Sequence, residues 1–243
     1  MAVPAPEADD ELADDYLERV MAFLDRHEHE VELVATRLLI LREGEDDEPQ
    51  DVHPLRHKFA RGNRVIDLRA EPDALHLSGG TAFLRLDRLR AESLAFDEEL
   101  RPDFEDAHLI ARYLLRAPAP TIGAVSDARY RYRKHRDGSS LSESAWSTAG
   151  KYTVVPRRGI LHLLEDAGRL DRPVPTWLQN LALYELGWYF RKDAAVGTAS
   201  AGQAPATFDL LHATLEELLP LLDEEVICEF RLYSLSDDIR FVL

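Results

Sequence analysis

The sequence contains a single cysteine and no long hydrophobic run. Cys228 is the single cysteine among 243 residues, so no disulfide can form within the chain and a cysteine-based metal site lacks ligands. No apolar stretch approaches the roughly 18 residues that a membrane-spanning helix needs. The first residues also lack the basic and apolar regions of a secretory signal. We therefore expect a cytoplasmic protein with at most peripheral membrane association.

Positive charge is scarce as well. Lysine and arginine total 29 against 45 aspartates and glutamates, which gives a formal net charge of −16. Proteins that bind nucleic acid generally are usually basic, so we expect no nucleic-acid partner. The hydrophobic content of 45% excludes a wholly disordered chain. The length leaves room for one large domain or two small ones.

The N-terminal part alternates helix and strand patterns. A helix is expected to begin at Asp14 or Asp15, because Leu17, Val20, Met21 and Leu24 then share one face. A second helix is expected over 104–117. Strand patterns occupy 31–41, 64–68, 74–78, 121–125 and 128–134.

After about residue 145 the pattern becomes helical. Helices are expected from Pro156 onward, over 174–193 and over 208–223, and the end of the chain (228–235) resembles a strand. The predicted organisation is an α/β part, residues 1–145, followed by a helical region, residues 146–243.

An acidic cluster precedes the first predicted helix. Glu7, Asp9 and Asp10 lie within four positions of one another. Closely spaced carboxylates suit a hard divalent cation, which takes oxygen ligands and shares its coordination shell with phosphates. The same cluster is also typical of an acidic, frayed N-terminus.

A second pair of acids, Glu105 and Asp106, opens the helix predicted over 104–117. A carboxylate at this place could act as general base for a hydroxyl nucleophile. Acids also favour the first turn of a helix because they complement its dipole, so both interpretations stay open.

The most basic segment runs from Tyr130 to Arg136 and is followed by a loop of small residues. Arginine, lysine and histidine beside such a loop can hold a diphosphate. Alternating basic and aromatic residues also fit single-stranded nucleic acid, although the net charge opposes this interpretation. An edge strand with a solvated, charged face is the remaining alternative.

Taken in order, these segments resemble the second half of a family 2 glycosyltransferase with the GT-A fold. In particular they resemble the group that builds Gram-positive cell-wall polymers, including teichoic acid glycosyltransferases. The similarity is carried by EADDELADDYLERVMAFL, HPLRHKF, RVIDL, LSGGTAFLRLDRL, FDEELRPDFEDAHLIARYLL and YRYRKHRDGSS, and by the helical tail AWSTAGKYTVVPRRGILHLL and PTWLQNLALYELGWYFRKD. It rests on their order and spacing over about residues 6–193.

The resemblance implies a transferase that moves a sugar from a nucleotide-diphosphate donor to a hydroxyl of a cell-wall polymer, with inversion. It implies that Asp9 and Asp10 hold Mg²⁺ or Mn²⁺ together with the donor diphosphate, and that Asp106 is the catalytic base with Glu105 in support. Further residues implied near the sugar or acceptor are Gly79 and Gly80. Those implied to close over the diphosphate are Arg133, His135, Arg136 and Ser140.

Two departures from the family pattern stand out. Ala8 fills a position of the acidic stretch, and that stretch lies at residue 7, so the nucleotide-binding half expected upstream is absent from this sequence. The chain is then expected to lack the nucleotide pocket and to be incomplete as an enzyme. The alternative is a non-catalytic interaction module associated with a cell-wall polymer enzyme. We also expect the apolar strand 31–41 to be exposed and covered by a second copy or a partner subunit.

Overall fold

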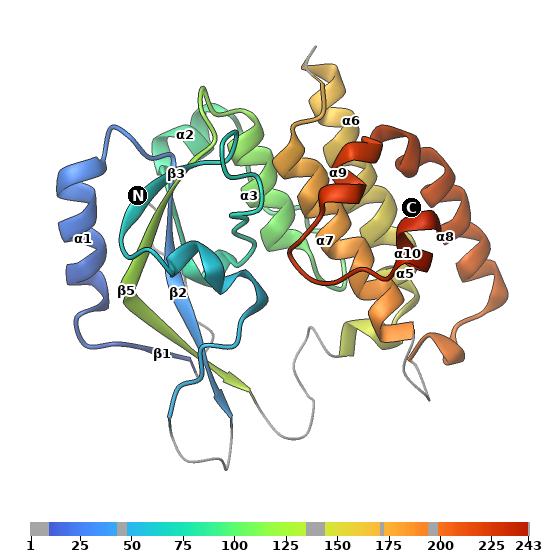
Figure 1. Ribbon diagram of the computed structural model, residues 1–243, viewed down its shortest axis with the longest axis horizontal. Coiled ribbons are helices and arrows are strands. Elements are labelled where there is room, and N and C mark those ends of the chain that lie inside the picture. Colours follow the sequence, from blue (N-terminus) through green and yellow to red (C-terminus); the bar gives the residue numbers. More distant parts are fainter. Residues whose placement is uncertain (1–9, 43–47, 135–143, 171–172, 194–198, 243) are drawn as a thin grey trace. The chain divides into compact units, whose positions relative to one another are not determined.

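The computed structural model describes residues 10–42, 48–134, 144–170, 173–193 and 199–242 (Figure 1). The chain divides into two compact units, Met1–Ala95 with Leu109–Ser140, and Phe96–His108 with Leu141–Leu243. A segment from the middle of the sequence thus joins the C-terminal helices. The mixed sheet and the helical region confirm the predicted fold class. The mostly parallel order of a complete nucleotide-binding sheet is not seen among the described residues.

The first unit is built around β5 (Thr121–Lys134), the longest strand described. One edge of β5 pairs in parallel with β2 (Leu33–Arg42), which pairs antiparallel with β4 (Ala82–Leu84). Its other edge pairs antiparallel with β3 (Arg64–Asp67) and, further along, with the two-residue β1 (Glu11–Leu12). In Figure 1 this sheet contains the blue β2 and the yellow-green β5 side by side. β5 therefore connects segments far apart in the sequence.

The two strands expected at 121–125 and 128–134 are one continuous strand. The pairing with β2 shifts register within it, since Thr36 lies opposite Val125 whereas Arg37 lies opposite Arg129. The extra residues of β5 form an irregularity that the longer strand absorbs without ending. Turn-like Ser126 and Asp127 thus interrupt the pairing but not the strand.

Helix α1 (Tyr16–His27) packs against the sheet with a different face from the one expected. Tyr16, Val20 and Phe23 are buried at 1% exposure or less, whereas Leu17 and Met21 are 49% and 55% exposed. The helix begins after Asp15, as predicted. The aromatic residues decide its orientation, because they bury more apolar area than the aliphatic residues they displace.

The strand expected at 31–41 is β2, but it does not lie exposed. Leu33, Val34 and Ala35 are fully buried, and Val34 packs in one hydrophobic cluster with Tyr16, Val20 and Phe23 of α1. The expectation that its apolar faces need a second chain to cover them is therefore wrong.

The strand expected at 74–78 does not form, although Ala74, Leu75 and His76 are all buried. The carbonyl of Leu75 instead accepts a hydrogen bond from the Lys58 ammonium at 2.6 Å, and its N–H donates to the Asp73 carbonyl at 2.8 Å. Lys58 lies in the short helix η1 (Pro54–Phe59) and also donates to the Leu55 carbonyl at 2.9 Å. These bonds satisfy backbone groups that a strand would otherwise have paired.

Gly123 on β5 allows the close approach of α1, and its replacement by alanine is expected to destabilise the protein. A Cβ atom at this position would lie 2.4 Å from Cε1 of Phe23, which is fully buried and cannot swing away. Overpacking of this kind costs about 1–3 kcal/mol. Urea unfolding of Gly123→Ala should show a lower midpoint.

Gly168→Ala is the matched control for Gly123→Ala. It lies on α6 (His162–Arg169), where an added Cβ meets no atom within 4 Å. A helical glycine replaced without a clash is expected to leave the free energy of unfolding unchanged or raise it by roughly 0.5–1 kcal/mol. An unchanged midpoint for Gly123→Ala would contradict the packing argument.

The second unit consists of helices around the buried cluster of Trp146, Tyr152 and Tyr189. Its first helical run comprises η3 (Ala145–Ser147), α5 (Ala149–Val154), the π-helical segment η4 (Val155–Leu161) and α6. Pro156 therefore lies within a helical run that has begun at Ala149. The rest comprises α7 (Thr176–Asp193), η5 (Ala199–Gly202), α8 (Pro205–Leu218), η6 (Leu219–Leu221), α9 (Glu224–Glu229) and α10 (Asp237–Val242).

The strand expected at 228–235 is also wrong. Helix α9 continues to Glu229, and the following residues are irregular. Tyr233 donates its hydroxyl to the carbonyls of Leu183 and Tyr184 on α7, at 2.9 and 2.7 Å. The carbonyl of Phe230 accepts from Arg240 at 2.8 Å. The alternating aromatic pattern therefore serves to dock this segment on α7 rather than to form a ladder.

Candidate functional site

Asp10 is held against the cationic strand β5 by two hydrogen bonds. Its Oδ2 accepts from the Tyr130 hydroxyl at 2.5 Å, and its Oδ1 accepts from the Arg133 backbone N–H at 3.0 Å. The antiparallel pairing of β1 with β5 places Leu12 opposite Tyr130 and so brings the acid to this point. Two groups singled out in the sequence, the N-terminal acid and the basic strand, therefore meet in the first unit.

Glu11 forms ion pairs with the same strand. It is hydrogen-bonded to the guanidinium of Arg133 and lies 3.5 Å from Nη1 of Arg131. The side chains of Glu11 and Arg133 are 44% and 31% exposed, so these pairs are accessible to solvent. Exposed ion pairs contribute little to stability, and an incoming anion can compete for the arginines.

Gly80 belongs to this cluster through Tyr130. It lies in the short helix η2 (Gly79–Thr81), and a Cβ atom on Gly80 would lie 3.3 Å from the Tyr130 hydroxyl oxygen. The glycine therefore leaves room for the hydroxyl that holds Asp10. Tyr130 itself was not predicted as a site residue, although the alternation of aromatic and basic residues over 128–134 marks its face as distinct from that of the arginines.

The oxygen atoms of Asp10 are suitable ligands for Mg²⁺ or Mn²⁺. Among the described residues, however, no group of three histidine, cysteine, aspartate or glutamate side chains is placed to hold a metal ion. Asp9, the second ligand implied by the resemblance, lies outside the described residues. The metal site therefore stays a prediction.

Glu105 and Asp106 open α3 (Glu105–Leu115) and lie in the second unit. Both side chains belong to half-buried residues. Burial raises the pKa of the Glu105 carboxyl, and the negative charges of Asp106 and Asp103 add to the shift. A carboxyl whose pKa is raised holds a proton closer to neutral pH, which is the property required of a general acid or base.

The residue before this pair has an unusual backbone. Phe104 has φ of +79°, in the left-handed region that residues other than glycine rarely adopt. Its ring packs on Gly159 of η4, where a Cβ atom would come within 2.7 Å of Phe104 Cδ1. Strained residues of this kind are often found at functional sites.

Four predicted site residues remain, and of these the structure describes Gly79. His135, Arg136 and Ser140, expected to close over a diphosphate, lie outside the described residues. Gly79 lies next to Gly80 in η2 and is half-buried.

In the parts of the chain that the structure describes, no helix combines the length and apolar character needed to cross a membrane.

No family model matches the chain. The chain is 26% identical over 227 residues to the minor teichoic acid biosynthesis protein GgaB of Bacillus subtilis, which covers 93% of this chain and 24% of GgaB. It is 28% identical over 180 residues to the minor teichoic acid biosynthesis protein GgaA of the same organism, covering 74% of this chain and 38% of GgaA. The chain thus spans well under half the length of these two relatives.

The fold resembles crystal structures of Staphylococcus aureus TarS. Residues 1–349 of TarS in complex with UDP align with a TM-score of 0.55 at 16% identity, covering 91% of this chain and 56% of that one. A longer TarS structure aligns with a TM-score of 0.53 and is covered to 34%. These comparisons confirm the predicted resemblance to teichoic acid biosynthesis proteins and the corresponding fold.

Proposed function

We propose that this chain is part of a glycosyltransferase that adds sugar to a cell-wall polymer of the teichoic acid type. The observation that carries the proposal is the cluster in which Asp10 is bound by Tyr130 and by the backbone of Arg133. It brings an acidic residue and a cationic strand to one place, as a site for a sugar diphosphate requires. The similarity to GgaA and GgaB over most of this chain supports the choice of polymer.

In this proposal Asp10, with Asp9, holds Mg²⁺ or Mn²⁺ beside the donor diphosphate. The metal, when bound, stabilises the charge that develops on the leaving nucleoside diphosphate. Arg133 contributes positive charge to the same oxygens once it leaves Glu11. His135, Arg136 and Ser140 follow Arg133 in the sequence and complete the contacts to the diphosphate in this proposal.

Asp106 acts as the base for the acceptor hydroxyl. A hydroxyl is a weak nucleophile until its proton is accepted, so the carboxylate must contact it directly. The oxygen then attacks the anomeric carbon opposite the diphosphate, the bond to the diphosphate breaks, and the configuration inverts. Glu105, with its raised pKa, supports this step from the neighbouring position.

The proposal is tested by calorimetric titration with uridine and cytidine diphosphate-sugars, each with and without Mn²⁺. We expect binding through the diphosphate that requires the metal, and we expect Asp10→Asn to weaken it by at least about tenfold. Asp14→Asn removes a carboxylate from an exposed position on the same segment and is the matched control. Its affinity should equal that of the wild type.

A different result would favour the non-catalytic alternative. Absence of binding by either nucleotide sugar, with or without Mn²⁺, would count against a donor site in this chain and is the result that the interaction-module alternative predicts. Equal binding by wild type and Asp10→Asn would remove Asp10 from the donor site.

A further inference from the structure

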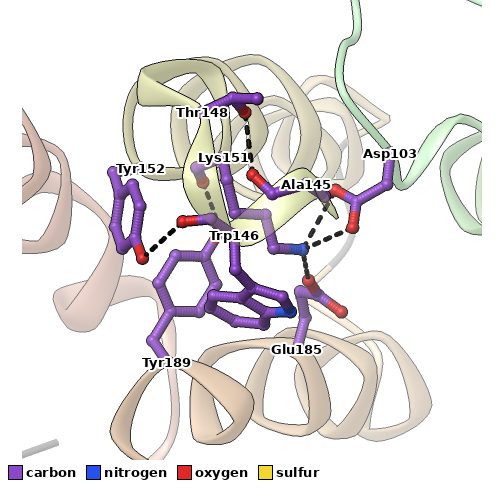
Figure 2. Close-up of polar contacts among 8 residues, drawn as sticks. All are labelled: Asp103, Ala145, Trp146, Thr148, Lys151, Tyr152, Glu185 and Tyr189. Atoms are coloured by element: carbon purple, nitrogen blue, oxygen red, sulfur yellow. Dashed lines mark hydrogen bonds and ion pairs between the residues drawn. The ribbon is translucent and has the colours of Figure 1, made fainter. Parts of the chain in front are cut away.

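Lys151 is a buried cation bound between two carboxylates in the second unit (Figure 2). Its ammonium donates to both oxygens of Asp103, at 3.0 and 2.9 Å, and to Oε1 of Glu185 at 2.6 Å. The Lys151 side chain is 3% exposed, and those of Asp103 and Glu185 are 23% and 12% exposed. Lys151 lies on α5 and Glu185 on α7, whereas Asp103 lies on the segment that leads into α3.

The rings of Trp146 and Tyr189 lie near the ammonium, as Figure 2 shows. It lies 4.7 Å from the centroid of Trp146 and 5.5 Å from that of Tyr189. Tyr189 also donates its hydroxyl to the Lys151 carbonyl at 2.6 Å. Burial works against the ammonium, but the two carboxylates outweigh it and raise the pKa of Lys151. The lysine therefore keeps its charge and its contact with Asp103.

A buried ion pair is a poor way to gain stability. The cost of taking the charges out of water often equals or exceeds their attraction, and apolar residues of similar volume commonly do as well. The three hydrogen bonds from the ammonium instead fix the orientation of the carboxylates that accept them. The group with a functional neighbour is Asp103, because it lies three positions before Asp106.

The backbone between Asp103 and Asp106 transmits this restraint. Phe104 adopts the strained left-handed conformation and is held by Gly159, and its carbonyl accepts the first helical hydrogen bond of α3, from the His108 N–H at 2.9 Å. The contacts of Asp103 and Phe104 hold the strained conformation in place. The first turn of α3, with Glu105 and Asp106, follows directly from it.

We propose that Lys151 is a positioning residue that acts through Asp103 to fix the first turn of α3 and so the direction of the Asp106 carboxylate. The inference rests on the proposed function for the role of Asp106. Its structural part, the control of the α3 first turn by Lys151 and Asp103, is measurable without any activity.

Asp103→Asn and Glu185→Gln form a matched pair for the test. Each removes the charge of one carboxylate bound to Lys151 and leaves the other in place, so each variant keeps a partner for the buried ammonium. The readout is amide hydrogen exchange at His108, whose N–H bonds to the Phe104 carbonyl. We expect exchange to quicken by at least about tenfold in Asp103→Asn and to stay within about twofold of wild type in Glu185→Gln.

Lys151→Met and the double variant with Asp103→Asn complete the experiment. If Lys151 acts through Asp103, the amide of His108 exchanges no faster in the double variant than in Asp103→Asn alone. Both variants lose the same contact, the one between Lys151 and Asp103. Equal exchange in Asp103→Asn and Glu185→Gln, or additive effects in the double variant, would overturn the proposal and leave Lys151 as a link between α5 and α7 only.

Where transfer activity is measured, the same variants separate kcat from KM. Misplacing a base lowers kcat with little change in KM, and we expect about a tenfold or greater fall in Asp103→Asn against none in Glu185→Gln. A wild-type protein without transfer would count against the proposed function, whereas the exchange at His108 would still decide the role of Lys151.

Discussion

Asp106→Asn is expected to lower the rate of sugar transfer by about 10²–10⁴-fold, the range by which a positioned base accelerates proton transfer. Asparagine has the same size as aspartate but cannot accept the proton of the acceptor hydroxyl. Because Asp106 lies in the first turn of α3 and is half-buried, the change should leave the fold intact. Transfer of labelled sugar from the donor to isolated polymer measures the effect, and thermal unfolding checks the fold.

The control for Asp106→Asn is a second acid in the first turn of a helix. Asp87 occupies that place in α2 (Leu86–Ala91), so Asp87→Asn loses the same interaction with a helix dipole. It should leave the transfer rate unchanged. Equal rates for Asp106→Asn and wild type would exclude Asp106 from the mechanism and would leave the helix-dipole interpretation of this acid.

The stability of the protein is expected to rise as the pH increases from 7 to 9, and this rise should disappear in Lys58→Met. Lys58 is 2% exposed, its ammonium donates to the carbonyls of Leu55 and Leu75, and it lies 5.1 Å from the centroid of the Phe59 ring. Burial lowers the pKa of Lys58 to about 7.

The direction of this pH dependence follows from the pKa of Lys58 in the folded and the unfolded protein. In the unfolded chain a lysine keeps its proton up to about pH 10.4, whereas in the folded protein Lys58 loses it above about pH 7. Between these values the unfolded state binds more protons, so the free energy of unfolding rises with pH. The slope is at most about 1.4 kcal/mol per pH unit, or roughly 3 kcal/mol from pH 7 to 9.

His53, His76 and Tyr16 titrate outside this window. Burial lowers the pKa of His53 to about 4 and lowers that of His76 well below its ordinary value, with the charge of Lys58 adding to both shifts. The pKa of Tyr16 is raised to about 12 by burial. Comparing the urea unfolding of wild type and Lys58→Met at several pH values between 7 and 9 therefore isolates the contribution of Lys58.

Lys192→Met provides the comparison for Lys58→Met. Lys192 is exposed near the end of α7, so its removal should preserve the wild-type dependence on pH. If Lys58→Met shows the same slope as wild type, Lys58 is charged in the folded protein and the assignment of the pH dependence is wrong.

The pattern of apolar residues along the chain was sufficient to predict those helices and strands whose backbone groups bond within the element or with a neighbouring strand. The apolar periodicity of α3 and the apolar run of β2 predicted these two elements. Helix α7 also forms where expected, although residues 177–184 are all buried and it presents no single apolar face. The pattern failed at 74–78 and 228–235, where the side chains suit a strand but the backbone groups are bound by Lys58 and Arg240 from elsewhere in the chain. Hydrogen bonds between distant residues leave no periodic trace in either segment.

By itself the sequence determined the fold class, the acidic overall charge and the resemblance to teichoic acid biosynthesis proteins, because these depend on composition and on the order of motifs. Only the tertiary structure decided that Asp10 meets Tyr130 and Arg133, and that Lys151 holds Asp103 ahead of Asp106. The physical reason is that strand pairing and helix packing join residues separated by 48 to 123 positions. Contacts at that range depend on how the elements pack, which local spacing does not encode.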